Sequence, residues 1–193
     1  MIGAITAGLF GTGYVAPVNT NSYESIATTN PSGTGTVTFN SIPNTYKHLQ
    51  IRAIFRNSAN VGGDDARLRF NNDSSTLYDG HRLYGLGSST ALANFTGVSD
   101  TGIPIGYNTA DGSTGASIFT GAIIDILDYA NTNKYKVVRT FDGFDNNGSG
   151  SIQVQSGLYR STTAISRIDL YCFNYGSNNW ATGTQFALYG IKG

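Results

Sequence analysis

The residues best suited to metal binding or nucleophilic chemistry are few and widely spaced. The chain has two histidines, His48 and His81, whereas a protein zinc site uses three or four ligands that converge on one point. Nothing in their spacing brings them together, so we interpret them as separate structural or surface residues. The single cysteine, Cys172, lies in an apolar run, which indicates a small core residue. It cannot form an internal disulfide. The sequence therefore predicts no metal and no cofactor.

Carboxylates suited to glycoside hydrolysis are also scarce. Such a reaction uses two carboxyl groups about 5 to 10 Å apart. Asp125 and Asp128 lie three residues apart on a predicted strand, so they point to opposite faces. Asp142 and Asp145 fall at a strand end and in a loop, and the chain has one glutamate, Glu24. We identify no catalytic pair and expect no enzyme activity.

One loop resembles a calcium site in part. Residues 145–152 place Asp, Asn and Ser oxygens at several positions of an EF-hand loop. The position of the bidentate glutamate is Ser156, however, and no helix flanks the loop. A hairpin turn rich in Asn and Gly is the better interpretation.

Two groups of residues are candidates for binding. If their two strands are neighbours in one sheet, Arg52, Arg56, Arg67 and Arg69 form a basic face for an acidic partner. The alternative is a solvated face balanced by nearby aspartates. The second group combines aromatic and amide side chains, which occur both in sugar sites and in protein interfaces. Its members are Tyr175, Asn178, Asn179 and Trp180.

The overall composition excludes several classes of protein. Of 193 residues, 12 are Lys or Arg and 12 are Asp or Glu, so the formal net charge is zero. Bulk electrostatics therefore favours neither a nucleic-acid nor an anionic-membrane partner. No apolar run reaches the roughly 18 residues of a membrane-spanning helix. The 25 glycines and the sparse Glu and Lys argue against long helices.

Short alternating segments separated by turns predict an all-β fold. The clearest is 48–57, where Leu49, Ile51, Ala53 and Phe55 share one face. The length favours a jelly-roll-like antiparallel sandwich over an immunoglobulin-like one, which needs only about 100 residues. We expect strands at 22–28, 36–42, 48–57, 67–70, 81–85, 118–129, 135–141, 151–159, 165–173 and 184–191. The segment 118–129 is mostly apolar, so we expect both of its faces to be covered.

The first 18 residues form a different kind of segment. They carry no charge and lack the basic residues that begin a secretory signal. We predict that residues 1–18 are an apolar arm for docking onto a partner, and that 19–193 form one β-sandwich domain. The expected docking side chains are Met1, Ile2, Ile5, Leu9 and Phe10.

Several motifs resemble a family of tailed-phage virion proteins, especially from marine and cyanobacterial phages. They span nearly the whole chain. The matching stretches are 1–9 (MIGAITAGL), 19–27 (NTNSYESIA), 41–52 (SIPNTYKHLQIR), 68–71 (LRFN), 81–85 (HRLYG), 126–136 (ILDYANTNKYK), 156–160 (SGLYR) and 186–193 (FALYGIKG).

The resemblance implies a non-enzymatic structural component located in the virion. We expect a capsid decoration, or cement, protein that docks through its arm onto capsid or tail proteins. The alternative is a carbohydrate-binding receptor module on a tail fibre or head appendage, with a host glycan as ligand. We further expect a homo-oligomer, for which a trimer is one closed arrangement.

Overall fold

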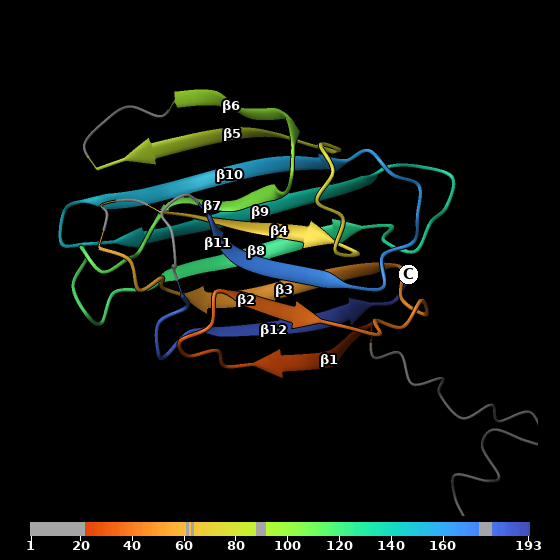
Figure 1. The fold of residues 1–193 in the computed structure, drawn as a ribbon, viewed down its shortest axis with the longest axis horizontal. Coiled ribbons are helices and arrows are strands. Elements are labelled where there is room, and N and C mark those ends of the chain that lie inside the picture. The colour runs from red at the N-terminus through yellow and green to blue at the C-terminus, as the bar shows by residue number, and fades with distance from the viewer. Residues whose placement is uncertain (1–21, 61, 63, 88–91, 174–178) are drawn as a thin grey trace, which may run out of the picture.

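The chain folds into a succession of β-strands joined by turns (Figure 1). The computed structural model describes residues 22–60, 62, 64–87, 92–173 and 179–193. Within these ranges there are twelve strands and no helix long and apolar enough to cross a membrane. The strands are β1 (Tyr23–Thr29), β2 (Thr36–Phe39), β3 (His48–Phe55), β4 (Asp64–Phe70), β5 (Tyr78–Leu86), β6 (Leu92–Asp100), β7 (Ile103–Thr109), β8 (Thr120–Leu127), β9 (Lys136–Asp145), β10 (Gly150–Tyr159), β11 (Ile168–Phe173) and β12 (Gln185–Ile191).

Two antiparallel sheets form a jelly-roll-like sandwich, which confirms the predicted fold class. The larger sheet has eight strands in the order β1-β12-β3-β8-β9-β10-β5-β6. The smaller has four, in the order β2-β11-β4-β7, and lies across the middle of the larger one (Figure 1). All strand pairs are antiparallel. The larger sheet therefore has one face against the smaller sheet and one face directed outward.

The hydrophobic core lies between the two sheets. In β3, Leu49, Ile51 and Phe55 are fully buried, as the alternation of that strand predicts. They pair sideways with equally buried residues of β8 and β12, including Ile124 and Leu188. The opposing layer comes from the inner face of the smaller sheet. Its main buried members are Val37, Phe39, Leu68, Phe70, Ile105, Ile168 and Leu170.

Sequence analysis located ten of the strands and missed β6 and β7. Both are edge strands, one in each sheet. β7 contains Pro104 and Gly106, residues that argue against a strand in the interior of a sheet. At a sheet edge, a proline whose nitrogen faces solvent costs no hydrogen bond to a neighbouring strand, because no strand lies on that side. The polar segment of β6 likewise lacks the apolar alternation of a half-buried strand.

The prediction that both faces of 118–129 are covered is wrong. In β8, Ile124 and Ile126 are buried, but Ile123, directly before Ile124, is 39% exposed. The smaller sheet covers only one face of the larger sheet, so alternate residues of β8 face outward. Both faces of β8 carry apolar residues, but only one of the two faces is buried.

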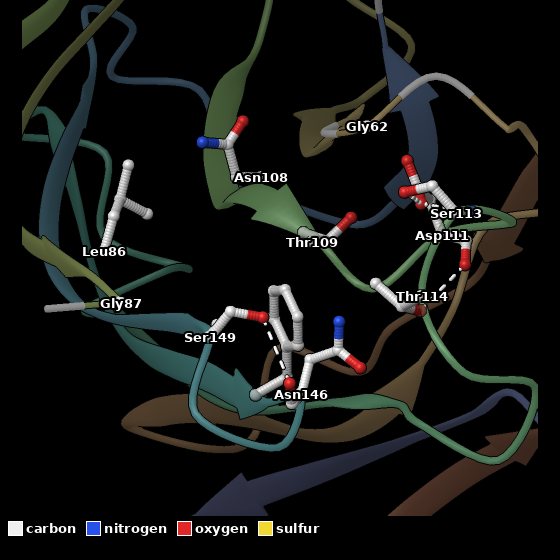
Figure 2. A pocket seen from close by; sticks show the side chains of 12 residues that line it. Gly62, Leu86, Gly87, Asn108, Thr109, Asp111, Ser113, Thr114, Asn146 and Ser149 are labelled. Atoms are coloured by element: carbon white, nitrogen blue, oxygen red, sulfur yellow. Dashed lines mark hydrogen bonds between the residues drawn. The ribbon is translucent and has the colours of Figure 1, made fainter.

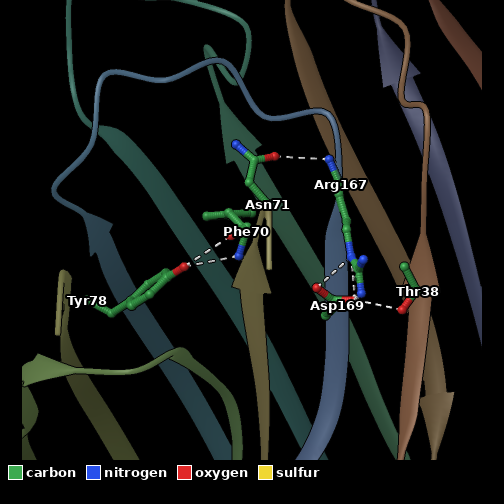
Figure 3. Close-up of polar contacts among 6 residues, drawn as sticks. All are labelled: Thr38, Phe70, Asn71, Tyr78, Arg167 and Asp169. Atoms are coloured by element: carbon green, nitrogen blue, oxygen red, sulfur yellow. Dashed lines mark hydrogen bonds and ion pairs between the residues drawn. The ribbon is translucent and has the colours of Figure 1, made fainter. Parts of the chain in front are cut away.

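Polar contacts fix the crossing from β4 to β5, where the chain passes between sheets (Figure 3). The Tyr78 hydroxyl accepts a hydrogen bond from the Phe70 amide at 3.2 Å and donates one to the Asp73 carbonyl at 2.9 Å. Burial raises the pKa of this hydroxyl above its usual value, so it stays protonated and can donate. Asn71 accepts a hydrogen bond from the Arg167 amide at 3.2 Å.

The same view shows an ion pair on the outer face of the smaller sheet. The Asp169 carboxylate accepts from the Arg167 guanidinium at 2.8 to 3.0 Å and from the Thr38 hydroxyl at 2.6 Å (Figure 3). These bonds join β2 to β11 and to the segment preceding β11.

Candidate functional site

The outer face of the eight-stranded sheet carries the most unusual surface of the described molecule. We call it the outer face. Six large apolar side chains lie on five adjacent strands, β3, β8, β9, β10 and β5, with 39 to 59% of each exposed. They are Ile54, Leu83, Ile123, Phe141, Ile152 and Val154. Exposed apolar patches of this kind mark interaction surfaces in soluble proteins.

Register places four of these side chains in one unbroken row. Ile123 of β8 pairs with Phe141 of β9, Phe141 with Val154 of β10, and Val154 with Leu83 of β5. Residues directly opposite on neighbouring strands have Cβ atoms about 5 Å apart. The row is therefore a continuous apolar ridge across four strands.

Beside the ridge the outer face is hollowed. A depression of about 400 Å³ lies over β12, β3 and β8. Small residues and partly exposed side chains line it, among them Arg52, Ile54, Ile123, Gln185, Ala187 and Tyr189. The apolar ridge over β8, β9, β10 and β5 and the hollow over β12, β3 and β8 therefore lie side by side and meet at Ile123.

A second hollow, of about 450 Å³, opens at one end of the sandwich (Figure 2). Asn108 and Thr109 approach it from the end of β7, and Asn146 and Ser149 from the turn between β9 and β10. Phe144 contributes an aromatic ring. The turn is closed by a hydrogen bond from the Ser149 hydroxyl to the Asn146 carbonyl at 3.1 Å.

The lining of this end hollow is nearly uncharged. Its one acidic residue, Asp111, already accepts hydrogen bonds from the amide and hydroxyl of Ser113, at 2.7 and 2.5 Å. Amides, hydroxyls and one aromatic ring remain to contact a ligand. Such groups suit a neutral, hydroxyl-rich molecule rather than an ion.

A third feature is a polar cluster buried between β7 and the strands β9, β10 and β5. Gln153 and Gln155 are 1 and 4% exposed. Gln153 donates to the Tyr107 carbonyl, and Gln155 donates to Asp142 Oδ1 at 2.9 Å. The Arg82 guanidinium carbon lies 3.5 Å from the centroid of the Tyr107 ring.

Within this cluster, Asp142 is 2% exposed, and burial raises the pKa of its carboxyl to about 7. The hydrogen bond from Gln155 and the charge of Arg82 offset part of that effect, whereas Asp65 adds to it. Oδ2 accepts no hydrogen bond from any described group. The cluster is enclosed, so it has the character of a structural feature rather than an open site.

The predicted basic face does not exist. Arg52 lies on β3 of the larger sheet, whereas Arg67 and Arg69 lie on β4 of the smaller sheet. The Arg56 guanidinium is buried and donates to the carbonyls of Gly115 and Ile118. The topology therefore separates Arg52 and Arg56 from Arg67 and Arg69, which the sequence pattern could not reveal.

The positive charges on β4 also have local partners. Arg67 pairs with Asp100 at 2.6 Å, and its guanidinium carbon lies 3.3 Å from the centroid of the Phe173 ring. Arg69 lies over the ring of Tyr171 at 4.9 Å. Aromatic rings and an aspartate thus engage the charges that we expected to be free for an acidic partner.

The expectation that Trp180 contacts a glycan is wrong for the described conformation. The side chain is 1% exposed and packs edge-on against Phe55 and Phe186, with centroid distances of 5.6 and 4.9 Å. The Asn179 amide donates to the Ser58 hydroxyl at 3.3 Å. Tyr175 and Asn178 lie outside the described residues.

The docking arm also lies outside the described residues. This applies to residues 1–18 and to their five docking candidates, Met1, Ile2, Ile5, Leu9 and Phe10. β1, the first described strand, forms an edge of the larger sheet, so the described part of the chain begins at the rim of that sheet (Figure 1).

The two histidines are on strands that lie far apart. Three strands separate β3, with His48, from β5, with His81, a distance of roughly 19 Å at about 4.8 Å per strand. His48 Nδ1 accepts from the Asp128 amide at 3.0 Å. In the described part of the chain, no three His, Cys, Asp or Glu side chains are placed to hold a metal ion.

Two further residue assignments agree with their sequence interpretations. Cys172 is packed against the core, and burial raises the pKa of its thiol well above the usual range, so it is not an activated nucleophile. Residues 145–152 form the predicted hairpin turn, in which the Asn146 amide donates to the Ser149 carbonyl at 2.7 Å. The turn joins β9 to β10.

Comparisons with known proteins do not place the chain in a family. No family model and no curated protein matches it. Among solved structures, it is similar to the galectin LEC-6 of Caenorhabditis elegans, with 8% identity and a TM-score of 0.32 over 91% of this chain and 99% of the galectin. It is also similar to the alginate lyase vAL-1 from Chlorella virus, with 10% identity and a TM-score of 0.28 over 84 and 82% of the two chains. These similarities are too low to bear on function.

Proposed function

We propose that this chain is a non-enzymatic structural protein of a tailed-phage virion. Its role is that of a capsid decoration protein, which binds a lattice of capsid subunits through the arm of residues 1–18. Many weak contacts to a symmetric lattice stabilise it by mass action, because each bound copy favours the assembled state.

The observation that carries this proposal is the apolar outer face. Six half-exposed apolar side chains on one sheet face suit a protein that works in contact with other subunits. The resemblance of several sequence motifs to those of tailed-phage virion proteins supports the same kind of assembly. The edge position of β1 places the start of the described chain at the rim of the body, where an arm can reach a neighbour.

The docking role of the arm predicts the effect of deleting it. Without residues 1–18, the domain is expected to fold with an unchanged circular dichroism spectrum, because the described strands begin at Tyr23. Its copy number in purified particles should fall at least about tenfold, the equivalent of roughly 1.4 kcal/mol of binding free energy. Quantitative mass spectrometry of particles provides the measurement.

A matched control keeps the arm but changes only its polar positions. Replacing Thr6 and Thr12 by serine should leave the copy number unchanged, whereas replacing Ile2, Ile5 and Leu9 by serine should reproduce the deletion. Normal incorporation of the deleted chain would exclude arm docking. Hundreds of wild-type copies per particle would favour the capsid, and a handful would favour the tail.

A second candidate function, glycan binding, is favoured by the end hollow of Figure 2. Its amides, hydroxyls and the Phe144 ring can recognise a sugar by hydrogen bonds and stacking. We propose this hollow as the receptor site of the alternative role, in place of the buried Trp180.

Glycan binding at the end hollow predicts a specific loss. Phe144→Ala should weaken binding of a neutral oligosaccharide about tenfold, because an aromatic contact contributes roughly 0.5 to 1.5 kcal/mol beyond its buried area. A glycan array followed by calorimetry measures this. Phe141→Ala is the matched control, since Phe141 lies on the same strand but on the outer face. Equal binding by both variants, or none by the wild type, would argue against the site.

A further inference from the structure

On β10 the apolar side chains face outward and the polar ones face inward, which is the reverse of the usual arrangement. Ile152 and Val154 face outward, 59 and 53% exposed, whereas Gln153 and Gln155 face the interior. Apolar side chains on the outside of a strand gain from burial only if another surface covers them. The outer face is therefore built as a contact surface rather than a solvated one.

The size of the patch fits one side of a protein interface. Six side chains at these exposures present roughly 400 Å² of apolar surface, within the range of the largest patches on monomers. A standard interface buries about 800 Å² on each partner, slightly more than half of it apolar. The patch and its polar rim therefore match the area that a stable dimer requires.

We propose that a second copy of this chain covers the outer face, as a two-fold dimer whose axis runs along the strands between β8 and β9. The six central strands, β12-β3-β8-β9-β10-β5, divide equally about this line. The ridge side chains Phe141, Val154 and Leu83 lie on one side. The hollow of about 400 Å³ lies on the other. The rotation seats these ridge side chains of each copy over the hollow of its partner.

Residue pairing under this rotation follows from the register. Ile123 on β8 of one copy faces Phe141 on β9 of the other. Arg52 on β3 likewise faces Val154 on β10 of the other copy. The cross-strand pair Gly121 and Gly143 lies in the row next to the ridge, and neither residue has a side chain that projects toward the other copy. A two-fold axis makes such contacts occur twice, because the same patch is used by both copies.

The charged residues of the outer face also fit this two-fold arrangement. The row beside the ridge contains Asp125 on β8 opposite Arg139 on β9. Asp125 accepts a hydrogen bond from Gln50 at 2.7 Å, and Arg139 forms no ion pair with any described residue. The rotation places Asp125 of each copy opposite Arg139 of the other. Two symmetric ion pairs would then flank the apolar contact and fix its register.

The inference names the partner of the outer face and rests on the proposed role in assemblies, but it is tested on the purified chain. Sedimentation equilibrium of the full chain from 1 to 100 μM should give the mass of two copies. Phe141→Glu should weaken association at least about a hundredfold, because the symmetric interface loses a central aromatic contact twice. Thr36→Glu, at an exposed position on β2 of the smaller sheet, should have no effect.

Charge reversal adds a test that does not depend on the hydrophobic contact. Asp125→Arg should weaken the dimer, and Asp125→Arg combined with Arg139→Asp should restore it. If Phe141→Glu does not fold, cross-linking replaces it: a mixture of the Ile123→Cys and Phe141→Cys proteins should link faster than either protein alone.

Three outcomes would overturn the dimer. The first is a wild type that is monomeric at 100 μM, and the second is an oligomer that Phe141→Glu does not affect. The third is a full chain that stays monomeric while the chain without residues 1–18 dimerises. The last would mean that the arm covers the outer face. Absence of the chain from particles, with the dimer intact, would contradict only the proposed virion function.

Discussion

Asp142→Asn is expected to stabilise the protein at neutral and alkaline pH. The Asp142 carboxyl is buried, and its pKa is raised from the model-peptide value of 3.8 to about 7. At about 1.4 kcal/mol per pKa unit, ionising it at pH 8 costs the folded state on the order of 4 kcal/mol relative to the unfolded chain. Asparagine is never charged, and its side-chain oxygen can still accept the hydrogen bond from Gln155.

The direction of the pH dependence follows from the raised pKa. Below about pH 3.8, the carboxyl is protonated in both states, so wild type and variant should have similar stability. Between pH 3.8 and about 7, the unfolded chain releases its proton first, so the wild type loses stability as pH rises while the variant does not. The difference should therefore grow across this window and level off above it.

Urea denaturation at pH 4 and pH 8 measures the effect. The midpoint difference between wild type and variant should be small at pH 4 and large at pH 8. Asp145→Asn, three residues away and exposed, is the matched control and should show a far smaller change. A pH-independent difference between wild type and Asp142→Asn would mean that the carboxyl is not desolvated in the folded protein.

Trp180→Ala is expected to cause the largest loss of stability among single aromatic truncations. Its ring packs edge-on against Phe55 and Phe186, which also stack on each other. Removing a fully buried aromatic side chain costs about 3 to 5 kcal/mol, because apolar burial is lost and a cavity remains. That is a large share of the roughly 5 to 15 kcal/mol by which domains are stable.

Circular dichroism during urea denaturation gives this loss without relying on the single tryptophan. Trp180→Phe should cost less, because it retains a ring in the same space. Tyr135→Ala, at a side chain 50% exposed, should stay within about 0.5 kcal/mol of the wild type. A Trp180→Ala loss below about 1 kcal/mol would show that the ring is not part of the core. It would also reopen the question of its exposure to ligands.

The sequence predicted the fold class and the location of ten strands, since both follow from local patterns. The alternation in β3 and the turn between β9 and β10 are visible in the order of residues alone. β7 was missed because Pro104 is tolerated only at a sheet edge. Edge position is a property of the assembled sheet.

The candidate sites were much less predictable. Arg52 and Arg67 have similar neighbours in sequence but belong to different sheets. Trp180 lies in a polar loop sequence, yet the hydrophobic core encloses it. In both cases the deciding contacts join residues far apart in the chain.

The sequence by itself therefore determined that this protein is an all-β chain with a formal net charge of zero. Only the tertiary structure decided which side of each strand faces outward. On β10, Gln153 and Gln155 face the interior, where they donate hydrogen bonds to the Tyr107 carbonyl and to Asp142. That leaves Ile152 and Val154 on the surface. Alternation separates two faces of a strand, but the face that is buried depends on which sheet packs against it.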